Sequence, residues 1–394
     1  MLESAILVAL VAVALWSTVF VLYQFILGCL YFVLRDKPIP AAAPLKRFAV
    51  IIPAHNEEMV IEAALESWKR VLYPAELFTV YVVADNCTDR TEEIARLHGA
   101  VSVRRQDNEK RGKGYALEWA LGELPLHKYD AIVFVDADTT VSAQFLVAMN
   151  KRLVNGAEAI QGFDGVLNPD ESWLTRLIQI TNVLKNLLFN HAKAKLGLSV
   201  QLMGTGMCFD RKALKRVGWK AFSIGEDGEQ FAYMAEAGIR VDYEPAALNY
   251  AQEAKSLRQA YTQRIRWAAG RMQLVGLGAR LVKKGLLRRD VRLIDAGLTF
   301  LVPSYVELGN VTLAGFVVSV LTASEWGGYL SLWFVGLIVV QGLYFFMGMA
   351  LSGVSVRVMC ALALIPLFLL WRLAVNVSAI SHIRRDVWVR TARE

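Results

Sequence analysis

The N-terminal stretch from Ser4 to Leu34 contains no Asp, Glu, Lys or Arg. A helix of that length, rising about 1.5 Å per residue, crosses a hydrocarbon core of ~30 Å with some tilt. No basic segment precedes it and no small-residue cleavage site follows, so the sequence predicts a retained membrane anchor over residues 1–37. Glu3 precedes the stretch, whereas Arg35 and Lys37 follow it. The positive-inside rule therefore predicts an outer N-terminus and a cytoplasmic chain after Arg35.

Composition agrees with a mixed architecture. Of the 394 residues, 55% are hydrophobic and 20% charged, with a mean hydropathy of +0.37. Such a chain is too apolar for an ordinary soluble protein and too charged for membrane helices alone, and its length allows one domain plus several spans. The four cysteines and five histidines are scattered, which favours neither zinc nor a disulfide framework. The net charge of +7 gathers near the apolar segments, which predicts contact with membrane lipids and no nucleic-acid partner.

A soluble domain is expected over residues 46–253, after a short linker at residues 38–44. Its apolar runs alternate between strand-like and helix-like spacing, which indicates an α/β fold with a mainly parallel sheet covered on both faces. In such sheets, ligands bind at the carboxyl ends of the strands. Strands are expected at Phe48–Ile52, Val80–Ala84, Val101–Arg104 and Ala131–Val135, and helices at Glu57–Val71, Thr91–His98 and Gly114–Leu121.

The C-terminal third changes character. Residues 254–292 interleave basic and apolar side chains, which is typical of amphipathic helices at a membrane interface, although a solvated basic helix gives the same pattern. Residues 293–381 are predicted to form membrane segments, and the arginine-rich tail, residues 382–394, is predicted to be cytoplasmic. The apolar blocks are Leu293–Thr322, Gly327–Leu351 and Val358–Ile380. Three crossings would leave the tail outside, so we favour a first block that is re-entrant or interfacial and broken at Pro303; alternatively, one block holds two short crossings.

Polar motifs follow several of the predicted strands. Asp136-Ala137-Asp138 comes directly after the run AIVFV, where two carboxylates can hold a hard divalent cation and its diphosphate ligand. The segments Pro53–Glu57 and Ala84–Asp89 end the first two strands, and either could be only a helix cap or a turn. Arg111–Gly114 places cations before a helix, where an anion could bind; a surface loop is the alternative.

Three further motifs lie later in the chain: Gly204-Thr205-Gly206, Gly225–Glu229 and Gln263–Trp267. In the last, the i, i+3 and i+4 spacing places Gln263, Arg266 and Trp267 on one side of a helix. An amide, a guanidinium and an indole on one face suit a diphosphate and a stacked sugar ring. The same residues would also serve as plain interfacial anchors.

The ordered series of motifs resembles the membrane-integrated family-2 glycosyltransferases: cellulose, hyaluronan, chitin and poly-N-acetylglucosamine synthases. The resemblance covers roughly Lys46 to Trp267 and extends more loosely to the membrane tail. It implies a cytosolic GT-A domain between N- and C-terminal transmembrane helices, in a multi-pass protein of a bacterial-type inner membrane. It also implies hexosyltransferase activity with a nucleotide-sugar donor, which we expect to be a UDP-sugar, and Mg²⁺ or Mn²⁺ as cofactor.

The same resemblance implies roles for individual residues. Asp227 matches the general base of the family's TED motif, with Glu226 beside it, and Asp138 matches the metal ligand of the DxD motif, assisted by Asp136. The acceptor is expected near Gly204, Thr205, Gly206 and Trp267. Donor-binding residues are expected to be Pro53, Ala54, Glu57, Asp85, Lys113, Asp136, Gln263, Arg266 and Trp267.

Two departures from the family pattern matter. Gly225 stands where the family's motif has Thr, which makes the orientation of Asp227 less certain. The tail segment Trp388–Arg393 only loosely resembles the loop that closes over the donor in polymerising members.

One carboxylate, Asp227, is placed to act on the sugar while the other pair holds metal, so a single displacement with inversion is expected. The motif QxxRW favours a processive polymerase that extends a polysaccharide and exports it through its membrane helices. The alternative is the transfer of one sugar to a lipid or polyprenyl-phosphate acceptor. A hypothesis of another class is a catalytically inactive, membrane-anchored scaffold that binds nucleotides.

Overall fold

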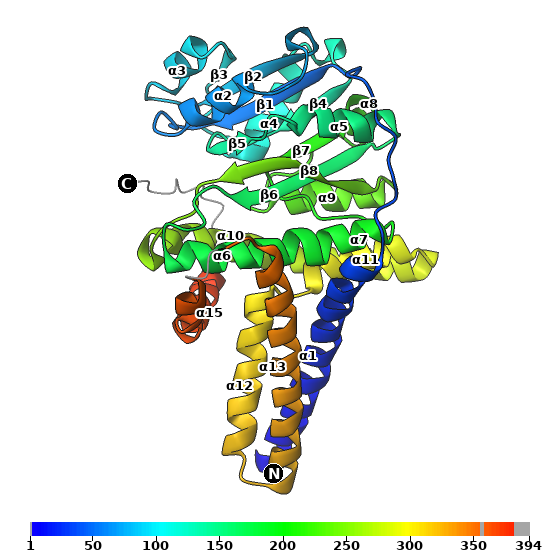
Figure 1. Cartoon of the computed structure of the whole chain (residues 1–394), viewed down its shortest axis with the longest axis vertical. Helices are drawn as coiled ribbons and strands as arrows, with labels where there is room; N and C mark the ends of the chain where they lie inside the picture. Colours follow the sequence, from blue (N-terminus) through cyan, green and yellow to red (C-terminus); the bar gives the residue numbers. More distant parts are fainter. Residues whose placement is uncertain (1, 355–357, 382–394) are drawn as a thin grey trace.

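We describe the chain from a computed structural model, which covers residues 2–354 and 358–381. The predicted basic tail and its Trp388–Arg393 segment lie outside these residues. The elements form three tiers: an α/β domain, a layer of flat helices beneath it, and a group of upright helices below that layer (Figure 1).

The α/β domain is built on one eight-stranded sheet with the strand order β3-β2-β1-β4-β7-β6-β8-β5. The half from β3 to β4 is parallel, as predicted. The other half is mixed, because β7 runs antiparallel to both β4 and β6, and β5 runs antiparallel to β8. The prediction of a mainly parallel sheet was therefore wrong for this half. The strands are β1 (Phe48–Ala54), β2 (Phe78–Asp85), β3 (Val101–Arg105), β4 (Ala131–Phe134), β5 (Thr139–Val141), β6 (Ala159–Val166), β7 (Met207–Asp210) and β8 (Val241–Ala251).

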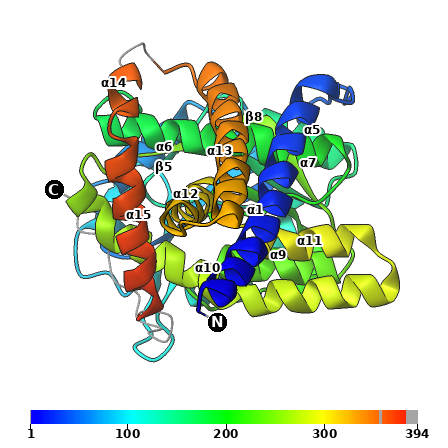
Figure 2. The ribbon, with the colours of Figure 1, turned by 90° about the horizontal axis from the view of Figure 1, so that it is seen from below.

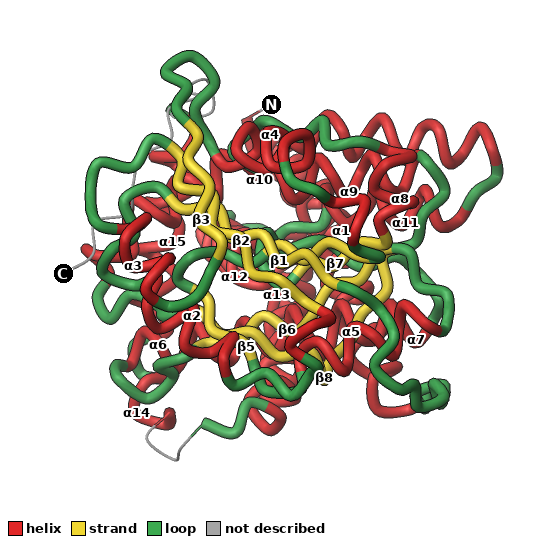
Figure 3. Tube along the Cα trace, turned by 90° about the horizontal axis from the view of Figure 1, so that it is seen from above, coloured by secondary structure: helices red, strands yellow, loops and turns green. Residues whose placement is uncertain are grey.

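Helices cover both faces of this sheet, as the sequence indicated (Figure 3). Alternate residues of β1 enter opposite cores, as the pleat requires: Phe48, Val50 and Ile52 pack with α2 and α5, whereas Ala49 and Ile51 pack with α4, α8 and α9. The covering helices are α2 (Ile61–Lys69), α3 (Thr91–Leu97), α4 (Lys113–Glu123), α5 (Phe145–Val154), α8 (Arg211–Val217) and α9 (Glu226–Glu236), with 3₁₀ turns at η1 (Ala75–Leu77) and η2 (Leu126–Lys128).

Long helices lie flat between the sheet and the upright helices (Figure 1). One continuous helix is formed by α6 (Trp173–Val183), the π-helical segment η3 (Leu184–His191) and α7 (Ala192–Lys195). The basic segment forms α10 (Leu257–Arg288), and α11 (Val291–Leu301) packs closely against it. A helix in this segment is thus confirmed.

The upright group consists of α1 (Leu2–Val33), α12 (Tyr305–Leu321) and α13 (Glu325–Leu351), which pack together through apolar side chains (Figures 1 and 2). In the described part of the chain, α1 and α13 are long and apolar enough to cross a membrane. The chain turns by 65° between α11 and α12, and the predicted break at Pro303 lies in that turn. The last apolar block forms α14 (Val358–Leu362) and α15 (Ile365–Ile380), and α15 packs across α10 and α12.

A buried ionic contact joins the tiers. Lys193 of α7 is fully buried, and its Nζ lies 2.8 Å from Oδ2 of Asp295 in α11. The same Nζ donates to the Thr299 hydroxyl at 2.7 Å, and Tyr23 of α1 donates to Asp295 Oδ1 at 2.7 Å. The Asp295 carboxylate of α11 therefore contacts both α7 in the flat layer and the N-terminal helix α1.

Lys193→Met should destabilise the protein strongly, because it leaves the Asp295 carboxylate buried without its cation. Removing one partner of a buried pair costs about 3–5 kcal/mol, so thermal unfolding of the detergent-solubilised protein should begin several degrees lower. The control is Arg216→Ala, which breaks the exposed pair with Glu158 and should cost ~0–1 kcal/mol. Equal melting temperatures for the two variants would contradict this role.

Candidate active site

One cavity of about 1220 Å³ opens at the carboxyl ends of β1, β2 and β4 and extends down to the upright helices. Ordinary small-molecule pockets measure ~300–1,000 Å³, so this one has room for two reactants. The residues that the sequence singled out line it together, with the exception of Gly206. The set comprises Pro53, Ala54, Glu57, Asp85, Lys113, Asp136, Asp138, Gly204, Thr205, Glu226, Asp227, Gln263, Arg266 and Trp267.

The upper end of the cavity is fixed by the turns after β1 and β2. Asn56 and Asn86 both adopt left-handed backbone conformations, with φ of 56° and 50°, which non-glycine residues rarely do outside functional or tight turns. Asn56 Oδ1 accepts from the Thr88 amide at 2.7 Å, and Asn86 Nδ2 donates to Asp85 Oδ1 at 3.1 Å. Arg105 lies 2.6 Å from the same Asp85 oxygen and is itself buried. The Asp85 carboxylate is therefore held in one orientation.

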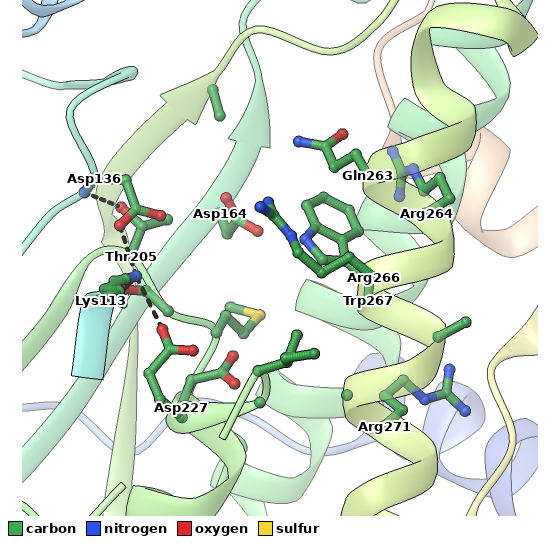
Figure 4. A pocket seen from close by; sticks show the side chains of 18 of the residues that line it. Lys113, Asp136, Asp164, Thr205, Asp227, Gln263, Arg264, Arg266, Trp267 and Arg271 are labelled. Atoms are coloured by element: carbon green, nitrogen blue, oxygen red, sulfur yellow. Dashed lines mark hydrogen bonds and ion pairs between the residues drawn. The ribbon is translucent and has the colours of Figure 1, made fainter. Parts of the chain in front are cut away.

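Lys113, at the start of α4, lies at the centre of a group of acids (Figure 4). Its Nζ is 2.6 Å from Asp136 Oδ1 and 3.2 Å from Glu226 Oε1, and it donates to the Gly204 carbonyl at 2.9 Å. Burial lowers the pKa of Lys113, but Asp136 and Glu226 outweigh this effect and raise it above its usual value. Lys113 is therefore a permanent cation among the carboxylates.

Burial has the opposite effect on the acids themselves. Burial raises the pKa of Asp136, although the charge of Lys113 acts to lower it. The same two opposing effects act on Glu226, whose pKa is also raised. Burial also raises the pKa of Asp227, although the Gly228 amide and Lys113 act in the other direction. Asp227 lies in the first turn of α9, where the helix dipole favours an anion. These carboxylates would gain from any further cation.

The turn at Gly204 and Thr205 positions the acids. Thr205 Oγ1 accepts from the backbone amide of Asp136 at 3.1 Å. Gly204 has φ of +83°, and a Cβ there would lie 3.4 Å from Lys113 Nζ and 3.7 Å from Asp227 Oδ2. Gly206 instead packs against Asn249, whose Oδ1 a Cβ would meet at 2.0 Å. The glycines keep space beside the general-base candidate and beside Asn249, and Gly206 does not line the cavity.

The residues present fit a divalent cation bound together with a diphosphate. Asp136 and Asp138 supply hard carboxylate oxygens, which suit Mg²⁺ or Mn²⁺. Over residues 2–354 and 358–381, no cluster of three His, Cys, Asp or Glu side chains could hold an ion by itself. Such ions often keep waters and take their remaining ligands from substrate phosphates, so two carboxylates are enough.

Helix α10 contributes the opposite wall. Gln263, Arg266 and Trp267 project from it into the cavity, and Arg266 and Trp267 reach toward Asp164 (Figure 4). Arg264 also lines the cavity, where it pairs with Glu253 at 2.6 Å, and its guanidinium lies 4.4 Å from the centre of the Trp267 ring. The predicted shared face of this helix is thus confirmed.

Two residues of the site were not predicted from the sequence: Asp164 of β6 and Lys185 of η3, which both line the cavity. Burial raises the pKa of Asp164 to about 6, and the charges of Asp136 and Asp138 add to the effect. Lys185 lies in the π-helical segment, an irregularity that is frequent at functional sites. In the sequence, the only available signal for Asp164 was a single acid between Phe163 and Gly165.

The lower end of the cavity is formed by the helices near Pro303. Tyr305, Tyr344 and Trp371 line it together with Glu307 and Arg372. Its walls therefore change from acidic at the centre to aromatic and cationic at the bottom. A reactant could enter there from the side of the upright helices.

Comparison with known proteins gives consistent results. Residues 44–270, more than half of the chain, match the glycosyltransferase-like family 2. A probable glycosyltransferase of Bacillus subtilis, YdaM, is 28% identical over 240 residues, which are 59% of this chain and 56% of that protein. An N-acetylglucosaminyltransferase of Rhizobium meliloti is 27% identical over 241 residues, 57% of this chain and 55% of the other. The chain thus spans about half the length of these curated relatives.

A solved structure shares the fold over nearly the whole chain. It is the mannosyltransferase PcManGT from Pyrobaculum calidifontis, in complex with GDP-Man and Mn²⁺; its TM-score is 0.59 at 20% identity, with 98% of this chain and 99% of that chain covered. The similarity includes the upright helices as well as the α/β domain. With its sheet, its acidic motifs and the matched residues 44–270, the chain belongs to the glycosyltransferase-like family 2.

Proposed function

We propose that this protein transfers a sugar from a nucleotide-diphosphate donor to a lipid-linked acceptor that reaches the cavity from the membrane. The observation that carries the proposal is the single cavity that joins the acidic centre to the upright helices. The donor is proposed to be a UDP-sugar, on the family resemblance.

The donor would lie along the upper part of the cavity. The fixed carboxylate of Asp85 suits the hydrogen-bond donors of a nucleotide base, and Pro53 and Glu57 lie at the same end. The diphosphate would lie between Asp136 and Asp138 on one wall and Arg266 on the other. Mg²⁺ or Mn²⁺ bound with the diphosphate would neutralise the charge of the leaving group. Arg266 and Lys113 add fixed positive charge to the same region.

Asp227 is proposed as the general base. As the acceptor oxygen bonds to the anomeric carbon, the bond from that carbon to the diphosphate breaks, and the acceptor's proton passes to the Asp227 carboxylate. The nucleotide diphosphate departs with the electron pair. Because attack and departure occur on opposite faces of the sugar, the configuration inverts. Glu226 is engaged by Lys113, which leaves Asp227 as the better base.

The three tiers support a proposed membrane arrangement. We propose that α1, α12 and α13 cross the bilayer while α10, α11 and α15 lie at its cytoplasmic surface, in an inner-membrane protein. The hairpin of α12 and α13 supplies two crossings, so the catalytic domain and α15 lie on the same side. The sequence led us to favour an interfacial or re-entrant first apolar block. In the proposed arrangement, the first block instead contains the crossing helix α12, and the last block, which forms α14 and α15, lies at the interface.

A lipid-linked acceptor fits this arrangement better than an exported polymer. The apolar side chains between α1, α12 and α13 are buried against one another, including Leu10, Leu308 and Phe334. The cavity reaches the upper turns of these helices, at Gln24, Glu307 and Tyr344. A polymer channel would need a polar path between them. Processive synthesis is the second candidate, and the QxxRW residues on the cavity wall are the observation that favours it.

Product length separates these two candidates. Purified protein supplied with nucleotide-sugar, divalent cation and an extract of bacterial membrane lipids should add a single sugar to a lipid. Mass spectrometry should then show a lipid whose mass has risen by one hexose or N-acetylhexosamine unit. A ladder or a high polymer would decide for processive synthesis.

Asp227→Asn should reduce transfer by at least ~10²–10⁴-fold, because the amide cannot take the acceptor's proton. Donor affinity should stay within about twofold, since the diphosphate is bound elsewhere. Asp138→Asn should instead abolish the metal-dependent binding of the donor. Calorimetric titration of nucleotide with and without Mn²⁺, followed by a transfer assay, measures both effects. Full turnover by the Asp227→Asn variant would refute the assigned base.

The pH dependence should report the raised pKa of Asp227. The base acts only when ionised, so kcat/KM should fall as pH decreases through that pKa, at a pH above the ~3.9 of an ordinary Asp. Lys113 lowers the pKa of Asp227, so Lys113→Met should move this acid limb to higher pH as well as slow the reaction. Lys69→Met, at an exposed pair with Glu66, is the control. A limb that moved to lower pH in the Lys113→Met variant would contradict the arrangement.

A further inference from the structure

Guanidinium groups gather at the lower end of the cavity, away from the acidic centre. Arg271 of α10 and Arg372 of α15 both line the cavity there, and Arg264 lies about two turns before Arg271 on α10. The two helices pack directly against each other through Ile265, Ala269 and Val375 (Figure 2). Charges from segments far apart in the sequence are thus brought to one place.

The carboxylates at this end do not satisfy the arginines fully. Arg271 Nη2 lies 2.6 Å from Glu307 Oε2, whereas Arg372 Nη2 reaches the other oxygen, Oε1, only at 3.9 Å. Glu307 Oε2 also accepts from the Ser304 amide at 3.0 Å, and Glu253 is already paired with Arg264. Arg372 Nε is buried without a hydrogen-bond partner among the described residues. The three guanidinium groups therefore share two carboxylates, and Arg372 is the least satisfied.

The surroundings of Arg372 make its incomplete pairing energetically unfavourable, which argues against a purely structural role. Its side chain is 13% exposed, and the adjacent Trp371 and Phe368 rings stack 5.9 Å apart and line the same cavity. A buried cation without full pairing destabilises a protein by several kcal/mol. Charged residues in apolar segments are rare, and they usually mark a binding site or pathway.

We propose that Arg271 and Arg372 bind a phosphate group of the lipid-linked acceptor proposed above, while a separate hydroxyl of that acceptor reaches Asp227 and attacks the sugar. Guanidinium groups bind phosphate through paired, charge-assisted hydrogen bonds. The aromatic side chains of Phe368, Trp371 and Tyr344 offer the lipid's hydrocarbon part an apolar wall next to that phosphate. This inference rests on the proposed function, and it names the chemical class of its acceptor.

In the proposed reaction, the diphosphate of the donor is a second anion in the same cavity. It is assigned to a different part of the cavity from the lipid phosphate. The donor is assigned to Asp136, Asp138 and Lys113, near the carboxyl ends of the strands, and to Arg266 on the facing wall, whereas Arg372 belongs to α15, which lies below α10 (Figure 1). Substitutions in the arginine pair should therefore affect the acceptor and spare the donor.

Binding of dodecyl phosphate to the full-length protein, purified in a maltoside detergent, tests the proposal by calorimetric titration. The wild type should bind dodecyl phosphate at least about tenfold more tightly than dodecanol or inorganic phosphate. Arg372→Gln and Arg271→Gln should each weaken dodecyl phosphate binding at least about tenfold, a loss of ~1.4 kcal/mol. Arg372→Lys should fall in between, because it keeps the charge and loses the paired geometry. The matched control on α10 is Arg258→Gln, an exposed arginine that should change nothing.

Nucleotide binding in the presence of Mn²⁺, measured on the same samples, separates this inference from the proposed function. Unchanged nucleotide binding with no preference for dodecyl phosphate would overturn the lipid-phosphate site alone. Inorganic phosphate binding as tightly as dodecyl phosphate would overturn the lipid part of the proposal. Absence of nucleotide binding to the wild type would overturn the proposed function itself.

If an arginine variant does not fold, thermal unfolding of the wild type still decides. Dodecyl phosphate should raise its melting temperature by several degrees more than dodecanol does, because only the phosphate engages the arginines. Equal shifts for the two compounds would contradict the site.

Discussion

Mutual repulsion among partly buried carboxylates is the constraint on which the site depends. Asp136, Glu226 and Asp227 face one cavity, and they can stay together because Lys113 lies between them. The mixed sheet, the turn at Gly204 and the first turn of α9 each bring one part of this group into place. A divalent ion that binds together with a diphosphate would add the positive charge that such a centre lacks. The cavity is therefore suited to the proposed reaction, in which the leaving group carries negative charge.

The same principle governs the helices beneath the domain. Acidic and basic residues in apolar segments are expensive to bury, and here they are paired across tiers. Asp295 meets Lys193 and Tyr23, and Glu307 meets Arg271. These contacts hold α1 and α11 against α7, and α12 against α10, which borders the cavity. The upright helices thus help to shape the lower end of the cavity.

Much of the catalytic half of the sheet could be predicted from the sequence, because each of β1, β2 and β4 is a continuous apolar run with polar residues at its end. The antiparallel half could not. Strands β5 and β7 have 3 and 4 residues, too few to show a period, and β6 pairs with β8 across some eighty residues of chain. Asp164 and Lys185 were missed for the same reason, since only this long-range pairing and the π-helical segment bring them to the cavity.

Proline and glycine residues show clearly what could not be predicted from the sequence. The break at Pro303 was predictable because proline lacks the amide that continues a helix, but the direction of α12 after it depends on packing with α1 and α13. Gly204 and Gly206 look equivalent in sequence. Only the structure shows that Gly204 borders Lys113 and Asp227 while Gly206 accommodates Asn249.

The most direct test of this account is an experimental structure of the full chain in lipid nanodiscs with UDP and Mn²⁺. The metal should lie against Asp138 and the diphosphate, the uracil of UDP should lie beside Asp85, and a continuous opening should lead from there to Tyr344 and Trp371. Nucleotide bound outside this cavity, or a wall of protein between the nucleotide and the membrane-side opening, would contradict this account.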